Sequence, residues 1–360
     1  MKEKILEEIG MKKIVSMVMC LVLLCGVVGC TNRSNDVEKT VVISDINGDE
    51  VEIPQNPEKI VCRSGNGTSF VVGMGHSDKL VGTADYVLTN PWISVFMDNS
   101  EHLQGYGWSP SSEEIYKTGA DLVMLADPDV AFNLRKDGIR AICYKQYNEQ
   151  EILDSAKLIG KIMHEEEYAS NWIQYYKSIN NYIDSKLNAV EESDRPKVYY
   201  IYGQSNKGLG RTDGGGSITQ HWVEGAGGVF TTKDLPNDGP KITVEEAISR
   251  NPDVILIGGV HSSALKDELL NSPEWSSVPA VKNNHIFQIP IGFTAWDFYG
   301  VEYPLLKLWV SKMLYPELID KDMHVETKEF YKQFFGKDFS DEQIDYILKA
   351  LNPEGNRYEN

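Results

Sequence analysis

Residues 149–192 read EQEILDSAKLIGKIMHEEEYASNWIQYYKSINNYIDSKLNAVEE, and this stretch decides the architecture. It holds no proline and a single glycine, Gly160. Apolar residues recur in it at the spacing of amphipathic helices. The acidic run at 165–167 predicts that a second helix opens after a break near His164, because carboxylates favour a helix N-terminus. That helix is predicted to extend to about Val190, a length of about 40 Å at 1.5 Å per residue, and to end before Pro196.

Strand-like runs alternate with helical runs on both sides of this stretch. Alternation of this kind predicts small, mostly parallel sheets with helices on their faces. The predicted strands are residues 59–63, 79–84, 121–126 and 141–145 before the long helix, and 197–203, 253–259 and 285–290 after it. The predicted helices are residues 111–118 and 130–137, then 218–225, 244–250, 264–270, 301–314, 328–335 and 341–351.

The predicted fold class is therefore α/β, with two Rossmann-like lobes joined by a single long α-helix. Its parts are a signal peptide (1–29), a lipidated flexible tether (30–39), an N-terminal lobe (40–164), a connecting helix (165–194) and a C-terminal lobe (195–360). A single helical connector predicts little hinge motion between the lobes, because a helix absorbs no large change of backbone dihedrals.

The first residues of the N-terminal lobe predict a β-hairpin. Residues 40–54, TVVISDINGDEVEIP, are two alternating runs around Asn47 and Gly48. Asp45, Asn47 and Asp49 also match the start of a calcium-binding loop, but the remaining ligand spacing and a glutamate at the twelfth position do not follow. The hairpin turn is the interpretation we adopt.

The N-terminal residues predict export and a lipid anchor. Lys12 and Lys13 precede an apolar run at 14–28, which is too short for a membrane-spanning helix and fits a signal-peptide core. The run closes on Val27-Val28-Gly29-Cys30, which resembles the lipobox of bacterial lipoproteins. Cys30 would then carry the lipid and hold the protein on the extracytoplasmic face of the cell membrane. The alternatives are a secretory signal cut elsewhere and a buried helix.

Composition excludes several classes of partner and site. The net charge of −18 argues against nucleic acid and anionic lipid as partners, and an anionic ligand would need locally placed arginines. Of the five cysteines, Cys62 and Cys143 lie outside the predicted signal and lipobox, and we interpret them as buried free thiols rather than a disulfide. No Cys/His spacing suggests zinc.

Eight short segments in a fixed order resemble class III periplasmic binding proteins, the group that carries iron-siderophore complexes, haem and cobalamin. They are PEKIV (57–61), WSPSSEEI (108–115), GADLV (119–123), LIGKI (158–162), GAGG (225–228), TVEEA (243–247), NPDVI (251–255) and WSSVPAV (275–281). The stretches at 308–317 and 330–331 look like a subgroup that handles iron complexes.

The resemblance implies the substrate-binding lipoprotein of an ABC importer, not an enzyme. Its expected cargo is a ferric siderophore-type chelate, with haem, a corrinoid or another metal complex as the alternative. Expected partners are a permease and an ATPase; no cofactor is expected to be bound permanently, and the protein is expected to be monomeric. A secreted hydrolase and a surface sensor or adhesin are the competing classes.

Ligands of open α/β sheets bind beyond the carboxyl ends of the strands, so the residues there are the candidates. Their aromatic side chains suit a flat, partly apolar chelate, and their arginines suit its carboxylates or oxygens. The alternative is that several aromatic residues only pack the lobe interface. The candidates are Arg63, Asn66, Tyr86, Trp92, Tyr106, Trp108, Tyr147, Tyr202, Arg211, His221, Trp222, Trp296 and Tyr299.

Other motifs and the docking residues complete the sequence-based expectations. Residues 203–210, GQSNKGLG, lack the ending of a phosphate-binding loop, and no G-x-S-x-G nucleophile motif occurs. The seven histidines are scattered, so a bare metal ion held by a histidine cluster is disfavoured, although His221 could complete the coordination of a chelate. Docking through one acidic residue on each lobe is implied by the resemblance, with Asp127, Asp129 and Glu224 as candidates.

Overall fold

The computed structural model describes residues 39–98, 100–203, 208–260 and 262–358. Residues Thr40–Asn360 form one compact unit with its own hydrophobic cores. The predicted signal peptide, tether and Cys30 lie outside the described residues. No helix among the described residues is long and apolar enough to cross a lipid bilayer.

The chain begins with the predicted hairpin, β1 (Thr40–Ser44) paired antiparallel with β2 (Glu50–Pro54). Gly48 adopts φ +86°, and the Asp45 carboxylate accepts the backbone N–H groups of Asn47 (2.9 Å) and Asp49 (3.1 Å). Arg135 forms ion pairs with both Asp45 and Asp49. These carboxylates therefore stabilise the turn and attach it to the rest of the lobe. The predicted hairpin is confirmed.

The N-terminal lobe is a five-stranded parallel sheet in the order β5-β4-β3-β6-β7. Its strands are β3 (Ile60–Cys62), β4 (Leu80–Ala84), β5 (Gln104–Tyr106), β6 (Leu122–Leu125) and β7 (Ala141–Cys143). Its helices are α2 (Gly65–Gly73), α3 (Asp85–Leu88), α4 (Ile93–Phe96), α5 (Ser112–Thr118) and α6 (Pro128–Lys136), with 3₁₀ turns at Ser77–Lys79 and Ser100–His102.

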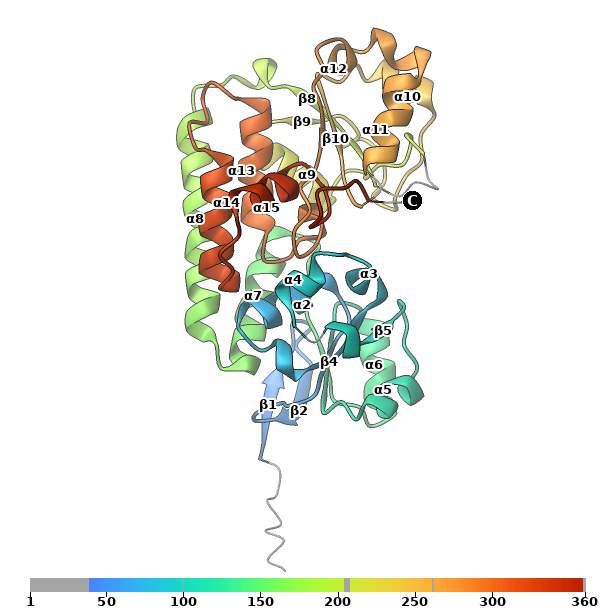
Figure 1. The fold of residues 1–360 in the computed structure, drawn as a ribbon. Helices are drawn as coiled ribbons and strands as arrows, with labels where there is room; N and C mark the ends of the chain where they lie inside the picture. The colour runs from blue at the N-terminus through green and yellow to red at the C-terminus, as the bar shows by residue number, and fades with distance from the viewer. Residues whose placement is uncertain (1–38, 99, 204–207, 261, 359–360) are drawn as a thin grey trace, which may run out of the picture. The chain divides into compact units, whose positions relative to one another are not determined.

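Both faces of this sheet are covered, which explains why its strands read as continuous apolar runs. Val61 and Val123 pack under α5 and α6 on one face. Ile60, Cys62 and Met124 face the other core. α2 and α7 (Glu149–Met163) contact each other on that side of the sheet (Figure 1). Cys62 and Cys143 are buried free thiols, as predicted, and burial raises the pKa of each to about 11.

Two helices form the connector. α7 (Glu149–Met163) ends at His164, which adopts the left-handed conformation (φ 59°), and α8 (Glu166–Leu187) follows with acidic residues in its first turn. The break near His164 is thus confirmed. The long helix has 22 residues, about 33 Å, and stops three residues before the predicted end.

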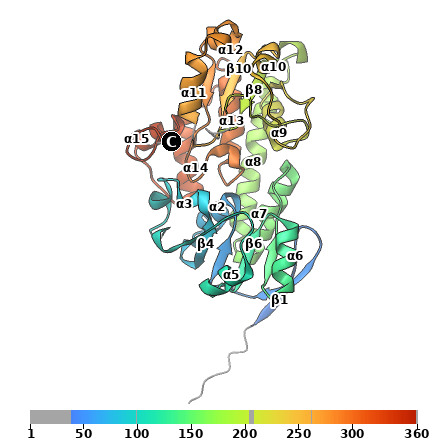
Figure 2. The ribbon, with the colours of Figure 1, turned by 90° about the vertical axis from the view of Figure 1, so that its right-hand side faces the viewer.

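The C-terminal lobe is built on a four-stranded parallel sheet in the order β11-β10-β8-β9. Figure 2 shows its neighbouring strands β10 and β8 beside each other. Its strands are β8 (Lys197–Ile201), β9 (Val229–Phe230), β10 (Val254–Ile257) and β11 (Ile286–Gln288). The helices are α9 (Ile218–Gly225), α10 (Val244–Ser249), α11 (Ser262–Asn271), α12 (Pro279–Lys282), α13 (Tyr303–Leu314), α14 (Met323–Phe335) and α15 (Asp341–Leu348), with 3₁₀ turns at Glu192–Asp194, Pro273–Ser277 and Trp296–Phe298.

One face of this second sheet packs against α10, α11 and α12, and its other face packs against α9 and α13. The core on the α9 and α13 side is continuous with that of the N-terminal lobe, because the chain returns to the first lobe after β11, whereas the core under α10, α11 and α12 is separate. Trp92 donates its indole N–H to the Leu351 carbonyl (2.9 Å), and Tyr358 donates to the Asn90 side chain (3.1 Å). The long helix is therefore not the sole link between the lobes.

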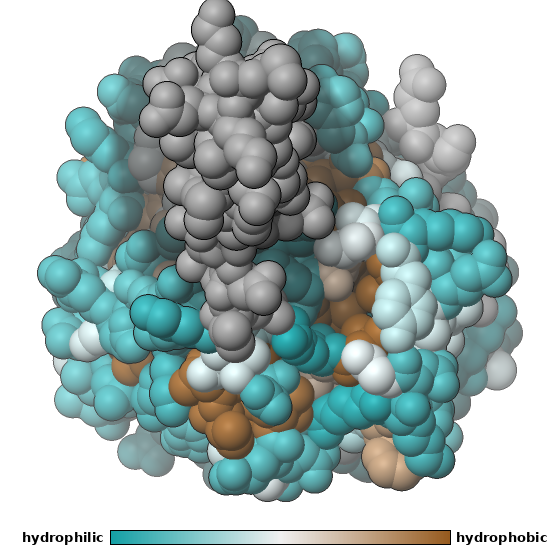
Figure 3. Space-filling view, turned by 90° about the horizontal axis from the view of Figure 1, so that it is seen from below, coloured by the Kyte–Doolittle hydropathy of each residue, from teal (hydrophilic) through white to brown (hydrophobic). Residues whose placement is uncertain are grey.

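The surface seen from below the N-terminal lobe is mainly hydrophilic, with small apolar patches (Figure 3). This distribution agrees with a chain in which 24% of the residues are charged.

Candidate ligand-binding site

The carboxyl ends of the strands of both lobes lead into loops that contact one another, and we call this region the lobe junction. Asn66 donates its side-chain amide to the backbone carbonyl of Tyr299 across the junction. The rings of Tyr86 and Phe298 meet edge to face, with centroids 5.7 Å apart. Residues from the two sheets are thus brought together where parallel α/β sheets commonly bind ligands.

Arg63 directly follows β3 and is held between two segments of the N-terminal lobe. One guanidinium nitrogen donates to the Gly107 carbonyl (2.9 Å), and the group lies 5.1 Å from the ring centroid of Trp108. Its Nε has no hydrogen-bond partner among the described residues. Trp108 itself is 80% exposed. A fixed cation beneath an exposed aromatic ring can receive an anionic, partly flat ligand.

α2 begins two residues after Arg63, in a segment where the sequence analysis predicted no helix. Ser64 is its N-cap and accepts the backbone N–H of Gly67 (3.2 Å). The Tyr86 hydroxyl accepts the N–H of Gly65 (2.7 Å). Asn66 is 1% exposed, and its Oδ1 has no partner among the described residues. The first turn of α2 is therefore part of the junction.

Arg211 of the C-terminal lobe repeats the arrangement of Arg63. Its guanidinium lies 5.5 Å from the ring centroid of Tyr202, the residue that follows β8. It packs so closely on Gly239 (φ +72°) that a Cβ there would lie 1.9 Å from a guanidinium nitrogen. Tyr202 is partly buried, and burial raises its pKa to about 12. Each lobe thus offers one arginine stacked on one aromatic ring.

Two acids lie near Tyr202, and both affect its pKa. Asp297 is 2% exposed, accepts a hydrogen bond from the Tyr200 hydroxyl (2.7 Å), and packs against Gly258 at the end of β10. The pKa of Asp297 is raised to about 6, mainly by burial and to a smaller extent by the charge of the nearby Asp213. Burial also raises the pKa of Asp213, whose carboxylate accepts from Thr219 (2.6 Å).

Tyr299 connects these acids to the first lobe. It adopts a left-handed backbone conformation (φ 63°), which is rare for a residue with a Cβ and is frequent at functional sites. Burial raises its pKa, and the charges of Asp213 and Asp297 raise it further. Sequence analysis missed Asp213, although it lies two residues after Arg211 in the same glycine-rich loop.

Four of the predicted ligand residues are core residues in this structure, so their assignment is corrected. Trp92 and Trp296 are fully buried, and their indole N–H groups donate to the Leu351 carbonyl and the Tyr331 hydroxyl. Trp222 is fully buried against Tyr200. Tyr106 is buried under α5. These rings fill the space between sheet and helices. Sequence patterns do not distinguish an aromatic residue that packs in the core from one that contacts a ligand.

Tyr147 and His221 are both accessible to solvent. Tyr147 is 60% exposed, donates to the Ala126 carbonyl (3.5 Å), and is near enough to Arg63 for that charge to affect its pKa. His221 is exposed on α9. No group of three or more His, Cys, Asp or Glu side chains that could hold a metal ion occurs among the described residues.

The three acids predicted to dock on a permease lie near helix ends. Asp127 is the N-cap of α6, with its carboxylate accepting the N–H groups of Asp129 (3.0 Å) and Val130 (3.1 Å), while Asp129 is exposed. Glu224 on α9 accepts a hydrogen bond from Gln220 (3.0 Å) and lies 3.7 Å from the Lys233 ammonium group.

Several known proteins are similar to this chain in sequence or in structure. A family model described as periplasmic binding protein matches residues 60–291. The iron(3+)-hydroxamate-binding protein FhuD of Bacillus subtilis (strain 168) is 23% identical over 317 residues, which are 81% of this chain and 95% of that protein. The molybdate-binding protein MolA of Haemophilus influenzae is 23% identical over 193 residues, 53% of each chain. The crystal structure of a periplasmic solute binding protein from Veillonella parvula DSM 2008 matches with a TM-score of 0.76 at 26% identity, over 88% of this chain and 99% of that one.

Proposed function

Because the chain belongs to the periplasmic binding protein family, the substrate-binding proteins of ABC transporters, we propose that it captures a ferric siderophore-type iron complex at the lobe junction and delivers it to a permease. No bond is made or broken in this function. The protein is a binding protein and not an enzyme.

The observation that carries the proposal is the pair of arginine–aromatic stacks, Arg63 with Trp108 and Arg211 with Tyr202. A ferric chelate presents oxygen atoms that share negative charge and a broad, partly apolar surface. Guanidinium groups bind such oxygens, and aromatic faces cover the apolar parts. The similarity to an iron(3+)-hydroxamate-binding protein over 95% of its length supports the same class of cargo.

The lipid anchor and the docking contacts form part of the same proposal. Cys30 within Val27–Cys30 would carry two acyl chains, which give stable attachment where a single chain gives only marginal binding. Asp129 is exposed beside Asp127 at the start of α6 and is available to a basic permease surface. Glu224 is the proposed counterpart on the other lobe, although Lys233 already lies beside it.

The test is a tryptophan-quenching titration of the protein from residue 31 onward with a ferric hydroxamate and its iron-free form. Saturable quenching by the ferric form is expected. Replacing Arg63 or Arg211 by alanine is expected to weaken binding by about tenfold or more, because a charge-assisted hydrogen bond contributes about 1.5–3 kcal/mol. Arg357→Ala is the matched control: Arg357 pairs with Asp267, and neither residue belongs to the lobe junction.

Other cargoes give distinguishable results in the same titration. A shift of the Soret band on adding haem, or an absorption change with cobalamin, would replace the iron chelate and keep the transport function. The relative that binds molybdate makes a small oxyanion the second candidate, because Arg63 and Arg211 would suit it as well. Binding of molybdate without any response to ferric chelates would contradict the proposed cargo.

A further inference from the structure

β11 is one of the two edge strands of the C-terminal sheet. The strand order ends on β11, which pairs in parallel with β10 only. On its inner side, the His285 carbonyl accepts the N–H of Ile255 (3.0 Å), and the N–H of Ile289 donates to the Ile257 carbonyl (2.9 Å). Backbone groups of a strand alternate between its two sides, so those of Ile286 and Gln288 point outward. No hydrogen bond between described residues satisfies them on that outer side.

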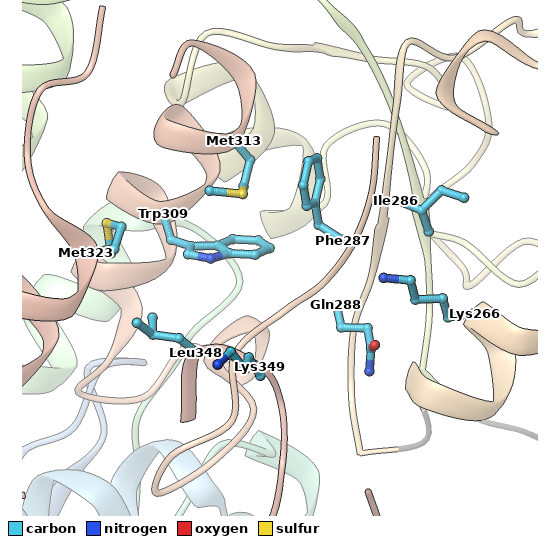
Figure 4. A pocket seen from close by; sticks show the side chains of 9 residues that line it. All are labelled: Lys266, Ile286, Phe287, Gln288, Trp309, Met313, Met323, Leu348 and Lys349. Carbon is cyan, nitrogen blue, oxygen red and sulfur yellow. The ribbon is translucent and has the colours of Figure 1, made fainter. Parts of the chain in front are cut away.

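A pocket of about 430 Å³ lies along this edge. Helices cover both faces of the sheet here. Beyond the edge strand, the pocket lies between these two helical layers. On one side lie the apolar side chains of Trp309, Met323 and Leu348 from α13, α14 and α15; on the other side lies Lys266 from α11 (Figure 4). Phe287 faces the apolar side, with its ring 6.4 Å from that of Trp309. The pocket therefore lies where an additional strand beside β11 would lie, with an apolar face on one side and a charged residue on the other.

Lys266 gives the pocket a chemical preference. Its ammonium group points toward the middle of the pocket in Figure 4, and no ion pair or hydrogen bond among the described residues involves it. Burial lowers its pKa, and the positive charge of Arg357 lowers it further. A partly buried lysine without a partner favours an incoming carboxylate. Lys349 at the other margin is already paired with Asp345 (2.8 Å).

We propose that β11 accepts an additional strand from a partner protein, an extended segment in which apolar and acidic residues alternate. Side chains of a strand point alternately to the two faces of a sheet. Placed beside β11, the segment would direct its apolar residues toward Trp309, Met323 and Leu348 and its acidic residues toward Lys266. The backbone groups of Ile286 and Gln288 would supply the hydrogen bonds, as in other cases of strand addition.

The probes for the test are two capped seven-residue peptides of alternating valine and glutamate. In one peptide the glutamates alone are N-methylated, so that the edge that faces β11 in a parallel arrangement keeps its N–H groups; in the other every residue is N-methylated. Fluorescence anisotropy of each labelled peptide is measured with the chain from residue 31 onward, whose folded unit starts at Thr40. The partly methylated peptide is expected to bind saturably, and the fully methylated one at least about tenfold more weakly, because it lacks the N–H donors that strand addition needs.

Protein variants separate the charge contribution from the backbone contribution. Lys266→Met keeps most of the apolar side-chain length. It is expected to lower the affinity for the partly methylated peptide by about fivefold to tenfold. Lys177→Met on α8, where Lys177 is exposed, is the control and should leave binding unchanged. Equal binding of both peptides, displacement of both by dodecanoate, or no binding of either would overturn the proposal. Displacement by dodecanoate together with equal binding would instead identify a pocket for small carboxylate amphiphiles.

Discussion

At the scale of single residues, burial changes the pH at which the Asp297 carboxyl ionises. The carboxyl is almost completely inaccessible, accepts one hydrogen bond from Tyr200, and has a second oxygen without a partner among the described residues. Burial is the main cause that raises its pKa to about 6. A raised pKa means that the folded protein holds this proton more tightly than the unfolded chain. The resulting stabilisation is present at pH values below 3.8 and is lost as pH rises through about 6.

Asp297→Asn should therefore change the pH dependence of stability. The amide stays neutral, so the mutant avoids the cost of burying a charge at neutral pH. The free energy of unfolding of the mutant relative to the wild type should rise by about 2 kcal/mol between pH 4.5 and 7.5, since one pKa unit corresponds to about 1.4 kcal/mol. Urea unfolding at several pH values measures this difference. Asp129→Asn, at an exposed site, is the control, and parallel profiles for Asp297→Asn and the wild type would contradict the prediction.

The candidate site shows what sequence can predict for single residues. Arg63, Tyr202 and Arg211 were predicted from their places near the ends of strands or in the loop that follows, and the structure places them at the lobe junction. Trp92 also follows a strand, but its indole N–H reaches the carbonyl of Leu351, 259 positions away. A tryptophan that fills a core and one that contacts a ligand look alike in sequence, because only long-range packing separates them.

At the scale of elements, α2 shows tertiary contacts overriding local preference. Its sequence GNGTSFVVG contains three glycines, which weaken a helix, and it was not predicted. Ser64 caps it, and the Thr68 hydroxyl donates to the Ser64 carbonyl (2.7 Å). Gly67 is needed for close packing, since a Cβ there would lie 2.5 Å from both Cys62 Sγ and the Tyr144 hydroxyl. By contrast, α7 and α8 were predicted well because their apolar spacing is regular and a break separates them.

Gly67→Ala should destabilise the protein although alanine favours helices more than glycine by about 1 kcal/mol. The added methyl group meets two fully buried side chains, and overpacking of this kind costs about 1–3 kcal/mol. Denaturant unfolding at neutral pH measures the loss. Gly107→Ala is the matched control, because the nearest atom to its added Cβ would be 3.9 Å away, an ordinary contact. An unchanged or higher stability of Gly67→Ala would show that the core around Tyr144 relaxes.

At the scale of the whole described unit, the return of the chain to the first lobe was not predicted. Local patterns predicted the connector, most helices and every strand except β5 and β9. They contain no information on which residues meet across 200 or more positions, such as Asn90 with Gly292 and Phe293. These contacts add to the connector in holding the two lobes together. They also strengthen the expectation of small hinge motion, because a hinge would have to break them.

Asn90 forms hydrogen bonds to two separate segments of this second link. It is buried, and its amide donates to the carbonyls of Gly292 (2.8 Å) and Phe293 (3.0 Å). Its side-chain oxygen accepts from the backbone N–H of Trp92 (3.2 Å) and from the Tyr358 hydroxyl (3.1 Å). Asn90→Ala removes all four hydrogen bonds, and at about 1 kcal/mol each it should lower the free energy of unfolding by roughly 2–4 kcal/mol.

Hydrogen–deuterium exchange then tests whether the loss of stability in Asn90→Ala is confined to the segments that Asn90 contacts. Residues 291–294 and 351–358 should exchange faster in Asn90→Ala, because each segment loses hydrogen bonds to the first lobe. The amides of α8 should keep their protection, since the connector does not depend on Asn90. Asn188→Ala, at the exposed end of α8, is the control. Faster exchange spread evenly over both lobes would mean that Asn90 supports the fold as a whole, and unchanged exchange would mean that the connector alone holds the lobes in place.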